Sequence, residues 1–121
     1  MFRRTARVTA QQAMVCQRFG AAPQPPRPGK LLGLRPEYPP EVWPVHALRH
    51  PPEGTSNGWY VWRGVPDIPQ DDDDFFKASH PDCMGPGFDL LLPYLALPPG
   101  WRVLVAPGHE DVWYDENLLV I

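Results

Sequence analysis

The sequence predicts a small α+β domain, in which an antiparallel sheet carries an N-terminal helix and one or two further helices packed on one face. Three patterns support this class. Residues 59–63 alternate as in a strand, residues 9–19 are spaced as in a helix, and residues 101–106 and 111–114 resemble two strands joined by a turn. The expected order is a helix, then a sheet with helices inserted before its final hairpin.

The strand predicted at residues 59–63 is the stretch around which we expect the sheet to form. It lies between two glycines, and its β-branched and aromatic residues alternate with a period of two. Trp59 and Trp62 are therefore expected to face opposite sides of the sheet. Aromatic side chains can stack on bases or sugars, but they also fill small cores. We expect core packing for Trp59, Trp62, Trp101 and Trp113.

The N-terminal part of the chain is expected to form one helix followed by a proline-rich segment. Thr9 is a suitable N-cap with Gln12 three residues later, and Gly20 is a suitable stop. Residues 21–44 are rich in proline and should be irregular except for a short strand at residues 30–34. Residues 45–49 are expected to form an edge strand.

The second half of the chain contains further turn and helix signals. Asn57-Gly58 is a dipeptide typical of hairpin turns. The acidic run at residues 71–74 can begin a short helix, because the helix dipole favours carboxylates there. Residues 88–97 indicate a leucine-rich helix in which Pro93 must begin a turn or cause a kink. The apolar tail at residues 118–121 has to pack or be bound.

Length and composition indicate one domain with long irregular connections. The chain has 121 residues, of which 43% are hydrophobic, so the composition is not that of a disordered protein. It contains 18 prolines, against about 6 expected from average usage. We expect a single domain over residues 1–121. Residues 1–44 would supply the helix and the proline-rich segment, and residues 45–121 the α+β core.

The net charge of −3 is unevenly distributed along the chain. Residues 1–50 hold eight Lys/Arg and two acids (+6), whereas residues 51–121 hold three Lys/Arg and twelve acids (−9). The acidic half disfavours nucleic-acid binding, which needs a basic footprint. It suits either neutralisation between the two halves or a partner with a basic patch. The candidate partner-binding residues are Asp71, Asp72, Asp73, Asp74, Asp82, Glu110 and Asp111.

Cysteine usage and hydropathy predict a cytoplasmic protein without membrane contact. Cys16 and Cys83 form no C-x-x-C motif, so two free thiols in a reducing compartment are expected. No apolar stretch approaches the ~20 residues that span a bilayer. The start of the chain lacks the continuous apolar segment of a signal peptide.

No catalytic motif is present, and the candidate metal ligands are incomplete. His80 and Cys83 form one H-x-x-C pair, whereas a structural zinc site needs two close pairs. The acidic run at residues 71–74 lacks the alternate spacing and the glycine of a calcium loop. We therefore expect no enzyme, no metal and no cofactor. A small metal-dependent enzyme using His80, Cys83 and His109 stays open as an alternative.

Several local strings, taken in order, resemble a known family. They lie at residues 47–54, 56–64, 74–77 with His80, 95–102 and 110–115. Together they are similar to the immunity protein 33 type of domain found in bacterial polymorphic toxin systems, over about residues 45–119. The resemblance implies a non-enzymatic inhibitor that binds a cognate toxin, which is expected to be encoded next to it. It implies turn-forming roles for Gly58, Gly64, Pro99 and Gly100.

Charge and resemblance together lead to one functional hypothesis and one alternative of another class. The acidic surface would meet a basic cleft of the toxin and block it, because complementary charge gives specificity and a fast association rate. The alternative is a structural or regulatory interaction domain, for which the apolar tail at residues 118–121 and the proline-rich loops would be suited.

Overall fold

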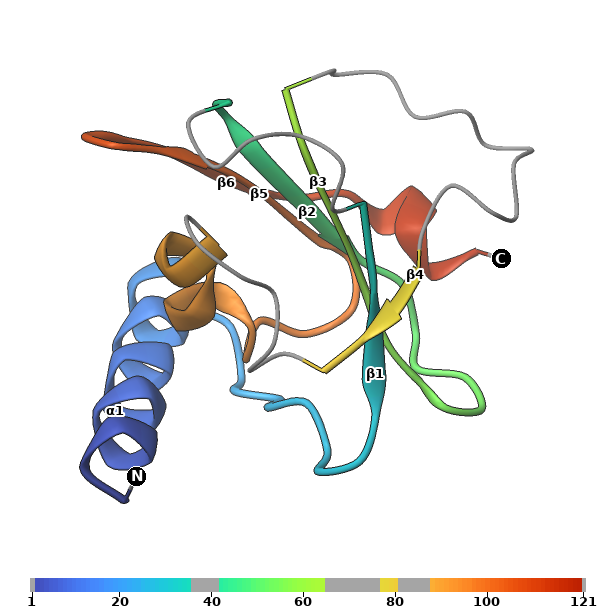
Figure 1. The fold of residues 1–121 in the computed structure, drawn as a ribbon, viewed down its shortest axis with the longest axis horizontal. Helices are drawn as coiled ribbons and strands as arrows, with labels where there is room; N and C mark the ends of the chain where they lie inside the picture. Colours follow the sequence, from blue (N-terminus) through green and yellow to red (C-terminus); the bar gives the residue numbers. More distant parts are fainter. Residues whose placement is uncertain (1, 36–41, 65–76, 81–87, 121) are drawn as a thin grey trace.

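The computed structural model describes residues 2–35, 42–64, 77–80 and 88–120 as an α+β fold around one six-stranded sheet (Figure 1). The strand order is β4-β1-β3-β2-β5-β6. The elements, in chain order, are α1 Phe2–Phe19, β1 Leu31–Leu34, β2 Val45–Arg49, β3 Ser56–Arg63, β4 Lys77–Ser79, the 3-10 helix η2 Phe88–Tyr94, β5 Trp101–Ala106, β6 His109–Tyr114 and the 3-10 helix η3 Glu116–Leu119.

The sheet is mixed, which corrects the expectation of an antiparallel sheet. Strands β1 and β3 are parallel, while the pairs β1–β4, β2–β3, β2–β5 and β5–β6 are antiparallel. The chain passes from β1 to β2, but β1 lies on the far side of β3. Strand β2 pairs with β3 on one side and with β5 on the other, so it is an interior strand rather than the expected edge strand.

Two element boundaries differ from the prediction. Helix α1 begins at Phe2 rather than at Thr9, because the Arg and Ala residues before Thr9 are good helix formers. Residues 88–97 do not form an α-helix. They form a 3-10 helix that ends at Tyr94, and Pro93 inside it lacks the N–H group that an α-helical turn would use.

The Asn57-Gly58 dipeptide does not form the predicted hairpin turn but lies inside β3. The turn comes earlier, where Glu53 and Ser56 exchange backbone hydrogen bonds of 3.2 and 2.9 Å. The Oδ1 atom of Asn57 accepts from the Trp59 N–H at 3.0 Å, and the His50 N–H donates to the Gly58 carbonyl at 2.8 Å. Side chain and backbone thus hold an irregular strand start in place.

The main core lies on the face of the sheet toward η2 and α1. Trp59 and Val61 of β3 are fully buried there with residues from β1, β2, β5, η2 and α1. The indole N–H of Trp59 donates to the Leu95 carbonyl at 2.9 Å. Figure 1 shows α1 (blue) beside the short helix η2 (orange), and η2 in turn contacts β2 and β5.

The opposite face of the sheet carries a smaller cluster. Trp62 and Leu48 are buried there with Leu118 of η3. The imidazole of His46 stacks on the indole of Trp62, with ring centroids 4.9 Å apart and planes 9° apart. Trp59 and Trp62 therefore face opposite sides of the sheet, as the alternation predicts.

Candidate protein-binding surface

Strand β6 is an edge strand whose outward face is exposed. Its neighbour β5 is paired along its whole length, with Arg102 opposite Trp113 and Leu104 opposite Asp111. Side chains directly opposite one another share a face, so the row His109, Asp111 and Trp113 lies on the face away from η2. We call this row the β6 outer row. The side chains of His109 and Asp111 are 58% and 62% exposed, and Trp113 as a whole residue is 43% exposed.

The inward row of β6 has a structural role. The carboxylate of Glu110 accepts two hydrogen bonds from the Arg18 guanidinium, at 2.7 and 3.0 Å, and one from the Tyr94 hydroxyl. These three residues, the Glu110 clip, join β6, α1 and η2. The pKa of Glu110 is lowered, mainly because Arg18 hydrogen-bonds its charged form. Burial, and then Glu110, raises the pKa of Tyr94 to about 12.

The predicted acidic residues therefore fall into three groups. Glu110 is half-buried and is used within the fold, whereas Asp111 projects into solvent with its carboxylate 3.4 Å from the His109 imidazole. The others, Asp71, Asp72, Asp73, Asp74 and Asp82, lie outside the described residues. Among the described candidates, Asp111 is the carboxylate best placed to meet another molecule.

Trp113 is exposed, which differs from its expected place in the core. Trp59 and Trp62 are buried and Trp101 is half-buried, but 43% of Trp113 is accessible. Its position explains the difference, because β6 is the last strand of the sheet and Trp113 lies on the face away from η2. The sequence does contain a signal for this outcome. Trp113 has the same parity as His109 and Asp111, two residues that rarely face a core.

The described residues contain neither a cluster of metal ligands nor a membrane-spanning helix. Within residues 2–35, 42–64, 77–80 and 88–120, no three His, Cys, Asp or Glu side chains gather as metal ligands. His80 is exposed at the end of β4, and Cys83 lies outside those ranges. No helix in the same part of the chain is long and apolar enough to cross a membrane.

Comparison with known proteins gives one family. The family model described as Imm33-like domain matches residues 11–115, which is most of the chain. No curated protein and no solved structure matches the chain. The match confirms the resemblance read from the local strings, and it extends N-terminally over part of α1 and over β1.

Proposed function

This chain belongs to the Imm33-like domain family, and on that premise we propose that it binds and neutralises a cognate bacterial toxin by protein–protein contact. The observation that carries the proposal is the family match over residues 11–115. A fold alone does not define a function, so the contact surface has to be argued from the side chains.

The β6 outer row has the chemistry of an interface centre. An exposed tryptophan offers a large apolar area at little cost in conformational entropy, and tryptophans are enriched among residues that dominate binding energy. Asp111, on the same row, adds a carboxylate suited to a basic partner. Strand β6 is also rigid, because β5 and the Glu110 clip hold it in place. Rigid presentation lowers the cost of association.

The acidic stretches form the second part of the proposed contact. Asp71–Asp74 and Asp82 would increase the association rate toward a basic toxin cleft, such as that of a nuclease. In this proposal Glu110 acts indirectly, by holding β6. The protein itself performs no chemistry and needs no cofactor, and its place of action is the cytoplasm.

Co-expression tests the proposal directly. The chain is expressed with the toxin encoded by the neighbouring gene, and growth and co-purification are measured. We expect growth to be rescued and a complex to be recovered. Loss of both results with a folded protein would overturn the proposal.

A pair of variants tests the surface. Trp113→Ala should weaken the complex at least about tenfold, as expected for a central interface residue, and Asp111→Asn should mainly slow association. The matched controls are Leu90→Ala and Asp89→Asn, because these neighbours on η2 are also exposed. If the η2 variants weaken the complex as much as the β6 variants do, the interface does not lie specifically on β6.

An oligomeric interaction domain is the second candidate, and one observation favours it. Leu119 and Val120 near the end of η3 are exposed apolar side chains, which a second copy could cover. Measurement of the molecular mass in solution tests this candidate. If the protein is a monomer at working concentration, it is not an oligomeric interaction domain.

A further inference from the structure

Arg49 is a buried cation whose hydrogen-bond partners are all neutral. It is 1% exposed and donates to the carbonyls of Asn57, Gln24 and Leu97 at 3.1, 2.6 and 2.7 Å. Its guanidinium also lies 5.5 Å from the ring of Trp59. These three acceptors are carbonyl oxygens, and no carboxylate of the described residues pairs with the guanidinium. Burial lowers the pKa of Arg49 to about 10, in agreement with a buried cation whose partners are neutral carbonyls.

Asn57 supplies an unused donor at the same place. Its Oδ1 atom accepts from the Trp59 N–H at 3.0 Å, and this bond fixes the amide so that Nδ2 points the other way. The residue is 1% exposed, and Nδ2 is buried without a partner within the described ranges. A buried donor without an acceptor destabilises the fold. An acceptor that enters from outside would recover this free energy.

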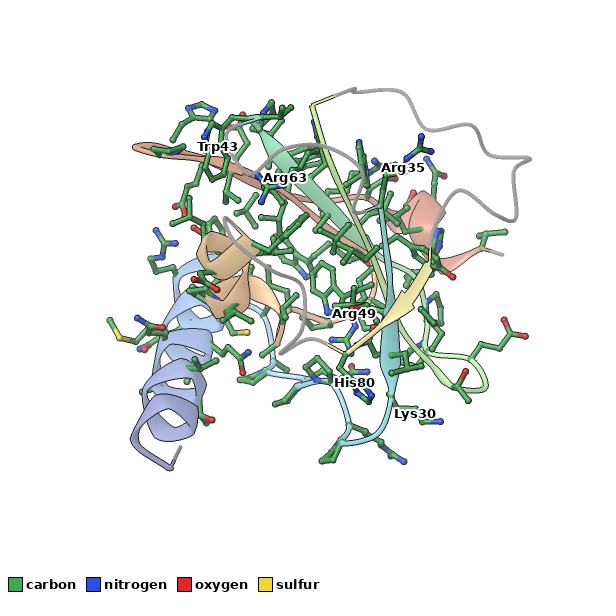
Figure 2. All side chains as sticks on the ribbon, viewed as in Figure 1. Lys30, Arg35, Trp43, Arg49, Arg63 and His80 are labelled. Atoms are coloured by element: carbon green, nitrogen blue, oxygen red, sulfur yellow. The ribbon has the colours of Figure 1, made fainter. Side chains whose placement is uncertain are left out.

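A pocket of about 460 Å³ lies against both residues. Arg49 and Asn57 line it together with two further cations, Arg27 and Lys30, and one carboxylate, Glu53. Figure 2 shows Arg49 in the interior and Lys30 at the outer end of β1. The charge of the lining is thus +2, counted as three cations against one acid. The volume is that of a small-ligand site rather than of a bare ion.

We propose that this pocket is a binding site for a carboxylate, contributed either by a free small molecule or by an acidic side chain of a protein partner. A carboxylate only accepts hydrogen bonds, so it matches a site that offers unused N–H groups and positive charge. The deep donors are Arg49 and Asn57, while Arg27 and Lys30 attract the anion at the rim. Glu53, which is exposed, competes with the ligand. The site does not depend on toxin binding.

Nuclear magnetic resonance of the ¹⁵N-labelled full chain tests the site, with N-acetyl-L-glutamate, acetate and inorganic phosphate as probes. We expect N-acetyl-L-glutamate to shift the side-chain amide signals of Asn57 saturably, with a Kd in about the millimolar range. Glu53→Gln should strengthen binding. The absence of a saturable shift with all three probes, together with unchanged toxin binding by the pocket variants below, would overturn the proposal.

Charge variants at the rim avoid the risk that Arg49 or Asn57 variants fail to fold. The double variant Arg27→Gln/Lys30→Gln should weaken binding roughly tenfold or more. The control, Arg3→Gln/Arg4→Gln, removes the same charge from the start of α1. Equal weakening by both would show a general charge effect and overturn the site.

The same variants separate the two sources of the carboxylate. If Arg27→Gln/Lys30→Gln also weakens the complex with the neighbouring-gene toxin, an acidic side chain of that toxin occupies the pocket. If only N-acetyl-L-glutamate binding is lost, the ligand is a free small carboxylate. Each outcome supports the site, and neither requires that the chain neutralise the toxin.

Discussion

Gly58 is a position at which backbone conformation and available space both require glycine. Its φ of +93° lies in the region that other residues rarely adopt. A Cβ atom built there would lie 1.9 Å from the carbonyl oxygen of His50. That carbonyl is backbone and cannot rotate away as a side chain would. The close approach of two strands therefore explains this glycine better than the hairpin turn that the sequence indicates.

Replacement of Gly58 by alanine is expected to destabilise the fold well beyond the cost of positive φ, which is of order 1–3 kcal/mol. The control is Gly108→Ala in the β5–β6 turn, since Gly108 also has a positive φ, of +74°, but nothing within 4 Å of its Cβ. Chemical denaturation of both variants measures the difference. Similar losses of stability would show that the contact with His50 is not decisive.

Cys16 is the other residue whose environment makes a clear prediction. The thiol is free and buried in the main core, and burial raises its pKa. Because the thiolate is the reactive form, Cys16 should react with iodoacetamide far more slowly in the native protein than in denaturant. Peptide mass spectrometry follows Cys16 separately from Cys83. Equally fast labelling in both states would mean that α1 leaves the core readily.

At the scale of elements, the Glu110 clip connects three parts of the chain that are far apart in sequence. Arg18 comes from α1, Tyr94 from η2 and Glu110 from β6. Helix α1 contacts η2 closely but has few contacts with the strands. The clip is therefore one of the few polar links between the helical layer and the edge of the sheet.

The stability that the clip contributes should depend on pH in two windows. The folded-state pKa of Glu110 is lowered, so its contribution is complete above the unfolded pKa of about 4.3 and is lost as the pH falls through the folded value. The folded-state pKa of Tyr94 is raised, to about 12. Its contribution is complete below the unfolded pKa of about 10 and is lost as the pH rises toward 12.

Denaturation curves of the wild type, Glu110→Gln and Tyr94→Phe, recorded across pH, measure these contributions. Glu110→Gln should flatten the acid window and Tyr94→Phe the alkaline one. The acid amplitude should be small, at most about 1 kcal/mol, because Arg18 is 52% exposed and solvent screens the pair. The alkaline amplitude should be larger, up to about 3 kcal/mol, because burial is the first cause of the raised pKa of Tyr94. If the free energy of unfolding follows the same curve against pH in all three proteins, the clip contributes no measurable stability.

Sequence patterns predict the single elements of this fold better than they predict which elements pair in the sheet. The strands at β1, β2, β3, β5 and β6 follow from local alternation and turn residues, which are properties of short segments. The parallel pairing of β1 with β3 depends on contacts between distant segments and leaves no local signal. The same limit applies to the pocket, because Arg27 and Lys30 reach Arg49 and Asn57 only through that pairing.

At the scale of the whole molecule, the first 44 residues share the core of the rest. Val15 and Cys16 of α1 and Leu32 and Leu34 of β1 belong to the same buried cluster as Trp59 and Val103. Strand β1 lies between β3 and β4, so the sheet is interrupted without it. We propose on this basis that the chain unfolds as one domain, although its charge changes sign along the sequence.

Replacement of Leu32 by alanine tests this proposal, because the mutated strand lies in the first 44 residues and four of the five tryptophans lie beyond them. Leu32 is 1% exposed in the main core, and removal of such a side chain costs about 2–5 kcal/mol. The buried Trp59 and half-buried Trp101 report mainly on β3 and β5. If the chain is a single domain, the tryptophan fluorescence transition should shift to a lower urea concentration by as much as the whole loss of stability requires. It should also coincide with the circular dichroism transition.

The control is Leu90→Ala, since Leu90 is 41% exposed and its replacement should shift the midpoint little. If the tryptophan transition stays in place, or separates from the circular dichroism transition, the N-terminal 44 residues unfold independently of the rest.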